Sequence, residues 1–146
     1  MAVSYTIDTA SGLSSSAVSG LLARLPDFAQ TVNGLAAPDL LISIWEPSAL
    51  ASSIIEEAFG FRPKLEVDFR VDDLRDGAAA VDRILRATAA LLRDTAEDTA
   101  LLLNGESVVL TRLQGRLLLY SIPRFWTDVR LKLMPEPSGF MDPVIL

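Results

Sequence analysis

The sequence predicts an α+β fold: a single domain with a largely antiparallel sheet of about six strands and three helices mainly on one face. Three patterns predict it, namely alternating apolar and polar residues, apolar residues at helical spacing, and three closely spaced strands near the end. The length of 146 residues suits one domain over residues 1–146. The tail, about 134–146, ends in apolar residues and is expected to pack on the body.

Two periodicities define the first strand and the first helix. Residues 3–8 alternate apolar and polar side chains, which is typical of a half-buried strand. Between residues 13 and 25 apolar side chains recur at the spacing of a helix. Ser11 or Ser14 is placed to cap this helix, and Pro26 ends it.

Turn-forming residues separate the next strand and helix. Residues 27–39 contain Gly and Pro and are expected to form a loop, and the apolar residues 40–45 a strand. Ser48 is placed to cap a helix that ends before Gly60, a residue suited to the left-handed position after a helix. One face of this helix is expected to carry Leu50, Ile54 and Ala58.

The clearest strand precedes the longest helix. Residues 65–72 alternate apolar and charged side chains without a break, so one face of this strand is expected to pack on a core. An Asp between residues 72 and 76 can cap the next helix, and Asp82 and Arg86 are spaced for an i,i+4 ion pair. The residues that fit its helical period are Val81, Ile84, Leu85, Thr88, Leu91 and Leu92.

Three short strands follow the long helix. Residues 100–103, 108–113 and 116–121 are separated by short turns and predict a meander of two hairpins. Residues 124–131 are expected to form one or two helical turns, with Trp126 as a core anchor.

The composition excludes several classes of protein. The sequence has no cysteine and no histidine, which removes a thiolate nucleophile, an imidazole base and any metal site built on those residues. The net charge of −6 opposes nucleic-acid binding, which needs a basic surface. Apolar runs fall far short of the roughly 20 residues of a membrane-spanning helix, and the start has no basic leader. We therefore expect a cytoplasmic protein that binds neither nucleic acid nor membrane.

A cluster of acids raises the question of a metal site, but its spacing argues against one. Asp68, Asp72, Asp73 and Asp76 fall within a short stretch, and such oxygen ligands hold Mg²⁺ or Ca²⁺. In an EF-hand loop starting at Asp68 the sixth residue would be Gly, but it is Asp73. We interpret the acids as a solvated strand edge and a helix cap. Nucleophile and phosphate-loop motifs are also missing, so no catalytic residue, metal or cofactor is expected.

The charged side of the strand at residues 65–72 is the candidate binding surface. If helices cover its apolar side, the other side presents acids and arginine beside aromatic residues, a composition typical of protein-binding surfaces. The polar side of the first strand, Ser4, Thr6 and Asp8, joins this face if that strand is oriented likewise. The candidate partner-binding residues are Glu66, Asp68, Arg70, Asp72, Asp73 and Asp76, and further candidates on this face are Trp45, Arg112, Arg116 and Tyr120.

Three stretches of the sequence resemble a known family. They are Glu57–Pro63 (EAFGFRP) running into Val67–Asp72 (VDFRVD), Ala100–Glu106 (ALLLNGE) with its following hairpin, and Phe125-Trp126 with Val129–Leu131 beyond. Together they resemble the third type of Sit immunity proteins, which neutralise swarm-inhibition toxins exchanged between bacterial cells. The likeness covers most of residues 1–135.

The resemblance implies an immunity protein that binds and blocks a cognate toxin without catalysis of its own, and it carries no catalytic residue over to this chain. An acidic inhibitor suits a basic toxin, because complementary charge speeds association. Two alternatives stay open. One is a small-ligand-binding or regulatory module that forms a homodimer through an exposed strand edge, and the other is a metal-dependent hydrolase that uses the acids around Asp72.

Overall fold

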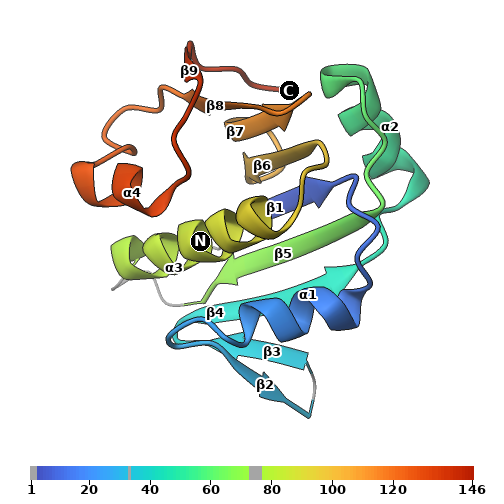
Figure 1. Cartoon of the computed structure of the whole chain (residues 1–146), viewed down its shortest axis with the longest axis vertical. Helices are drawn as coiled ribbons and strands as arrows, with labels where there is room; N and C mark the ends of the chain where they lie inside the picture. The colour runs from blue at the N-terminus through green and yellow to red at the C-terminus, as the bar shows by residue number, and fades with distance from the viewer. Residues whose placement is uncertain (1–2, 33, 73–76) are drawn as a thin grey trace.

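The computed structural model describes residues 3–32, 34–72 and 77–146 (Figure 1). Within these ranges the chain forms nine strands and four helices. In chain order they are β1 (Val3–Thr9), α1 (Ser15–Leu22), β2 (Ala29–Thr31), β3 (Gly34–Ala37), β4 (Leu40–Trp45), α2 (Ala49–Phe59), β5 (Leu65–Val71), α3 (Gly77–Asp94), β6 (Thr99–Leu103), β7 (Ser107–Leu113), β8 (Arg116–Tyr120), α4 (Asp128–Leu133) and β9 (Gly139–Met141).

All nine described strands lie in one sheet, in the order β2-β3-β4-β5-β1-β6-β7-β8-β9. Neighbouring strands are antiparallel except β8 and β9, which are parallel. The predicted α+β class with a largely antiparallel sheet is therefore confirmed, and the predicted meander is β6, β7 and β8. The first strand of the chain, β1, is the central strand of the sheet.

The sheet has more strands than the six predicted. β2 and β3 form a hairpin within residues 27–39, where the sequence predicts a loop, and β9 lies in the tail. Each is only 3 or 4 residues long. Such short segments cannot show a clear alternation, and the two edge strands β2 and β9 form because a neighbouring strand offers free backbone groups to pair with.

The main core lies between the sheet and the helices α1, α3 and α4, which share one face (Figure 1). β5 directs Val67 and Phe69 into this core, as its alternation predicts, and β1 adds Ile7. From the helix side α3 contributes Ile84 and Leu91, both fully buried. Burial stabilises the fold by about 1.5–3 kcal/mol for each such side chain, so these residues hold β1 and β5 rigidly at the centre.

Helix α2 lies on the opposite face of the sheet. The prediction of three helices mainly on one face therefore holds for α1, α3 and α4, and the described residues form one helix more than predicted. Its Ile55 is buried in a second, smaller core cluster. The other buried members of that cluster are Phe61, Ala100, Leu102, Val108 and Tyr120. Leu50 and Ile54, expected on one apolar face, are 72% and 44% exposed. A short helix with apolar residues on more than one side does not reveal which side packs.

The ends of the first two helices follow local sequence signals. The hydroxyls of Ser14 and Ser48 each accept a hydrogen bond of 3.1 Å from a backbone N–H in the first turn of α1 and α2. Gly60 ends α2 in the left-handed conformation, with φ of 79°. These caps satisfy backbone groups that a helix end would leave unpaired.

The segment around α4 is held by one local and one long-range hydrogen bond. Trp126 donates from Nε1 to the Tyr120 carbonyl at 2.9 Å, in keeping with its predicted role as a core anchor. Asp82 of α3 accepts a hydrogen bond of 2.8 Å from Arg130 of α4, where the sequence predicts a pair with Arg86. Across the described ranges, no helix combines the length and apolar character that crossing a membrane requires.

Candidate functional site

One area of the sheet, opposite α1 and α3, remains exposed beside α2. The helix packs over β1, β6 and β7 there, whereas β4 and β5 keep exposed side chains, with Leu41 55% and Trp45 48% exposed. The register sets these side chains in cross-strand rows over β4, β5 and β1. The rows are Trp45–Glu66–Asp8, Ser43–Asp68–Thr6 and Leu41–Arg70–Ser4. We call the residues of these rows, apart from the buried Asp8, the open face.

The structure brings together three of the six predicted binding residues. Glu66, Asp68 and Arg70 occupy alternate positions of β5 on the open face. Asp72 follows the strand, is exposed, and donates from its backbone N–H to the Asp39 carbonyl at 2.9 Å. The other two candidates, Asp73 and Asp76, lie outside the described residues.

Of the aromatic candidates, Trp45 lies on the open face and Tyr120 does not. The Trp45 Nε1 donates to Glu66 Oε1 at 2.9 Å, which holds the indole ring beside an acid. Tyr120 points to the same side of the sheet but is buried under α2, where its hydroxyl lies 3.3 Å from that of Thr111. Arg116, on β8, is exposed away from the open face.

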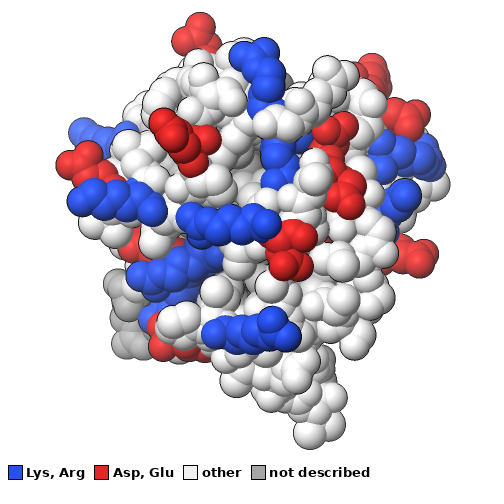
Figure 2. Space-filling view, in the orientation of Figure 1, with Lys and Arg blue, Asp and Glu red and all other residues white. Residues whose placement is uncertain are grey.

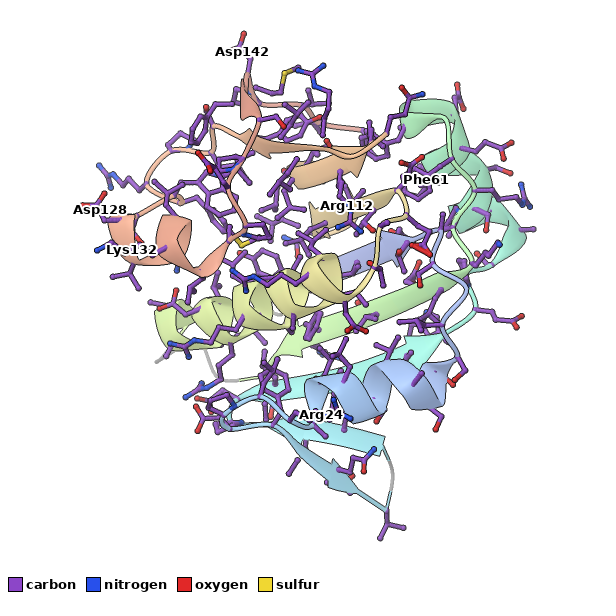
Figure 3. All side chains as sticks on the ribbon, viewed as in Figure 1. Arg24, Phe61, Arg112, Asp128, Lys132 and Asp142 are labelled. Atoms are coloured by element: carbon purple, nitrogen blue, oxygen red, sulfur yellow. The ribbon has the colours of Figure 1, made fainter. Side chains whose placement is uncertain are left out.

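The prediction that Arg112 lies on this face is wrong. The register of β6 and β7 shifts between Leu101 and Leu102, whose partners are Leu110 and Val108, so β7 carries a β-bulge at Val109. Beyond this bulge Arg112 faces the α3 side of the sheet (Figure 3). Its guanidinium donates to the carbonyls of Leu92 and Glu97. Arg112 therefore caps α3 at the Leu92 carbonyl, which lies in the last turn and has no partner within the helix, and it ties the loop residue Glu97 to the same guanidinium.

Asp68 is held in place by its cross-strand neighbour. The hydroxyl of Thr6 donates to Asp68 Oδ1 at 3.2 Å. Partial burial raises the pKa of Asp68, and the charge of Glu66 raises it further, while the bond from Thr6 and the charge of Arg70 act in the opposite direction. The open face therefore presents fixed acids, already oriented by Thr6 and Trp45 before any partner arrives.

Asp8 is the most perturbed acid of the described chain. It lies directly opposite Glu66, and α2 leaves only 2% of it exposed. Burial is the main cause that raises its pKa to about 8, and a hydrogen bond to Glu66 and the charge of Glu66 add to the effect. Its Oδ1 has no hydrogen-bond partner within the described ranges. Sequence alternation predicted that Asp8 shares a face with Thr6, but the burial of Asp8 depends on α2, and the sequence does not show which face of the sheet α2 covers.

A pocket of about 210 Å³ opens where α2 meets this part of the sheet. Its floor carries the carboxyl groups of Asp8 and Glu66, and its walls are mainly aliphatic. The complete lining consists of Thr6, Asp8, Ala51, Ile54, Ile55, Glu66, Leu102 and Gly105. No basic residue is among them, so the lining itself supplies no countercharge to the two acids.

The helix-covered side of the molecule differs in charge from the open face. Figure 2 shows Lys and Arg side chains spread over α3 and α4, interspersed with acids. Two of these arginines form ion pairs: Arg83 with Asp27 at 3.3 Å and Arg130 with Asp82 at 2.8 Å. The open face, by contrast, presents acids, one arginine and exposed apolar side chains. Such a surface suits recognition of a cationic partner surface.

Metal chemistry finds no support in the residues that the structure describes. Among them no three or more His, Cys, Asp or Glu side chains are grouped so that they could hold a metal ion. Of the acids that the sequence clusters here, Asp68 accepts a hydrogen bond from Thr6, and Asp72 is exposed beyond the strand.

A family model described as SitI3-like matches residues 3–130. The chain belongs to the SitI3-like family. The match spans β1 to β8 and ends within α4, so it includes the whole open face and the pocket beside α2. No curated protein and no solved structure matches the chain. The predicted membership in a Sit-type immunity family is confirmed.

Proposed function

We propose that this SitI3-like protein binds a cognate bacterial toxin in the cytoplasm and neutralises it by covering the toxin surface, without catalysis of its own. The observation that supports the proposal most directly is the open face. It presents exposed Trp45 and Leu41 beside the fixed acids Glu66 and Asp68. Family membership supplies the immunity role.

The open face has the physical properties of a binding surface. Trp is enriched among residues that dominate binding energies, and Trp45 is only half buried although Nε1 is already bonded to Glu66. Because β4 and β5 belong to a rigid sheet, little side-chain or backbone freedom is lost when a partner binds. These features favour a protein partner over a solvated, inert surface.

Charge indicates the kind of partner. Asp68 and Glu66 on the face, with Asp72 just beyond β5, give an acidic surface interrupted by Arg70. A toxin with a basic surface would be attracted to it more strongly than to the helix side, where Lys and Arg are interspersed with acids. We therefore propose a basic toxin surface as the partner of the open face.

The direct test is protection in a sensitive bacterial strain, with the toxin encoded beside this gene expressed together with the immunity protein. The wild-type chain is expected to restore growth. Replacing Asp68 and Asp72 together by Lys is expected to weaken binding by at least about tenfold, since like charges now face the partner. The domain should stay folded, because Asp72 is exposed and Asp68 is half-buried on the open face, where a Lys side chain can reach solvent.

The matched control replaces Asp94 and Asp142 together by Lys. It changes the net charge by the same amount as the Asp68 and Asp72 variant, at two exposed positions, one on α3 and one in the tail. This control is expected to protect as well as the wild type. Growth no better than with an empty vector would sink the immunity function. Equal binding by both double variants would leave the function standing but refute the placement on the open face.

A further inference from the structure

The pocket beside α2 contains a buried acid that the fold does not explain. Asp8 is 2% exposed, its Oδ1 has no hydrogen-bond partner within the described chain, and the neighbouring residue Glu66 is another acid. An unpartnered buried polar group usually destabilises a folded protein. Its other cross-strand neighbour, Ala100, offers no polar side chain. Asp8 therefore keeps one carboxyl oxygen, Oδ1, without a partner within the described chain, in an accessible pocket that it shares with Glu66.

We infer that this pocket receives a lysine or arginine side chain of the protein partner, whose aliphatic stem packs on Ile54 and Leu102 and whose cationic head binds Asp8 and Glu66. The inference rests on the proposed function, because the toxin supplies the side chain. The cationic side chain would be the group by which this protein recognises the toxin. It would bind next to the open face, because Glu66 belongs to both the pocket and the open face.

Size and lining fit this occupant. A water molecule accounts for about 30 Å³ of liquid, so a pocket of about 210 Å³ holds on the order of seven water-sized groups. The side chains of Lys and Arg have about five to seven non-hydrogen atoms, which is a close match. Both combine an apolar stem with a cationic end, the same order in which the pocket presents aliphatic walls and an acidic floor.

Binding should also change the protonation of Asp8. The titratable groups that face it are Glu66 and Asp68 of β5, while the parts of α2 and β6 packed against it are aliphatic. Without a cation the pKa of Asp8 is about 8, so the group is mainly protonated at pH 6. A bound cation favours the ionised carboxylate. Cation binding therefore releases a proton and becomes stronger as the pH rises from 6 to 8.5.

The test titrates the isotope-labelled full chain with n-butylammonium, n-butylguanidinium and uncharged n-butanol, followed by NMR. Both cations are expected to shift the methyl signals of Ile54 and Leu102 and the signals of Asp8, with millimolar affinity. Affinity for the cations should exceed that for n-butanol by about tenfold at pH 8.5 and should fall at pH 6. Preference for one cation would identify lysine or arginine as the natural group.

Two variants make the test specific. Asp8→Asn removes the charge at nearly constant shape and should reduce cation affinity about tenfold and abolish its pH dependence. Ala51→Leu fills the pocket without a change of charge and should prevent binding of all three probes, while Asp94→Asn on α3 should bind as the wild type does. Equal affinity for n-butanol, or unchanged cation binding by Asp8→Asn, would overturn the inference.

Because the probes require no toxin, the outcome is separate from the protection assay. Cation binding by a chain that fails to protect cells would remove the proposed function and leave the pocket as a cation site. Protection by a chain that binds neither cation would remove the pocket assignment and leave the immunity function.

Discussion

At Asp8 the fold keeps a carboxyl group under α2, opposite Glu66, and raises its pKa from 3.8 to about 8. In the unfolded chain the same group has the ordinary pKa of about 3.9. Between these two values the folded chain holds a proton that the unfolded chain has released. Stability must then fall as the pH rises, because raising the pH favours the state with fewer bound protons.

We expect the free energy of unfolding to decrease between pH 5 and pH 8, relative to that of Asp8→Asn, by up to about 1.4 kcal/mol per pH unit. The contribution of Asp8 is fully present below pH 4 and lost above pH 8. Urea unfolding at pH 5, 6, 7 and 8 measures it. The exposed Asp142→Asn should keep the wild-type pH dependence, and Asp8→Asn should show a flatter one. Parallel curves for the wild type and Asp8→Asn would contradict the assignment.

Glu66 differs from Asp68 because it belongs to both the open face and the pocket. It lies between Trp45 and Asp8, accepts the hydrogen bond that orients the Trp45 indole, and lines the pocket on its other side. A substitution there disturbs two surfaces at once. Asp68 lies on the open face, accepts a hydrogen bond from Thr6 and does not line the pocket, which is why its charge reversal reports on the open face and not on the pocket.

At the scale of the helices, two glycines allow backbone conformation to be separated from packing. Gly60 ends α2 with φ of 79°, whereas Gly20 lies inside α1 in ordinary helical backbone. At both positions an added Cβ would meet nothing within 4 Å. Any difference between the two alanine variants therefore reports on the backbone and not on crowding.

Gly60→Ala is expected to destabilise the chain by about 1 kcal/mol, because a residue with a Cβ is strained in the left-handed region. Gly20→Ala is expected to stabilise it by about 0.5–1 kcal/mol, since alanine loses less conformational freedom in a helix. Urea unfolding of the two variants at one pH measures both. Two shifts of the same sign would show that tertiary contacts outweigh these local effects.

Elements with a strong side-chain period could be predicted from the sequence. β1 and β5 were found because their alternation is set by one buried face, and α3 because its apolar stripe is long. β2, β3 and β9 were not, since pairing with a neighbouring strand, which sequence does not show, decides them. The face chosen by α2 depended on the second cluster, whose members come from distant strands.

The candidate site was predictable only in part for the same reason. The alternation of β5 placed Glu66, Asp68 and Arg70 together on one face. The bond between Trp45 and Glu66 needed the β4–β5 register, and the position of Arg112 depended on a β-bulge that inverts the facing of β7. Local sequence encodes facing along a strand but not the pairing between strands.

At the scale of the whole molecule, association with a charged partner depends more on how charge is distributed over the surface than on the net charge of −6. Lys and Arg gather over α3 and α4, and the acids Glu66 and Asp68 lie across the sheet from them. A basic partner therefore meets an acidic, attractive side and a side of mixed charge as it diffuses. Such a field orients the encounter and acts mainly on the rate of association, while apolar contacts such as those of Trp45 act on dissociation.

This distribution leads to a prediction for binding of the toxin encoded beside this gene, measured by stopped-flow at increasing NaCl. The association rate constant of the wild type should fall about tenfold between 0.05 and 0.5 M NaCl, because salt screens charges separated by more than a few ångströms. Asp68→Lys should associate more slowly at low salt and show a shallower salt dependence of the association rate constant, while the dissociation rate constant changes less.

The control is Asp94→Lys, which changes the net charge by the same amount on the helix side. Its association rate constant should keep the salt dependence of the wild type. If both variants lost the salt dependence to the same extent, the net charge and not the open face would steer the toxin.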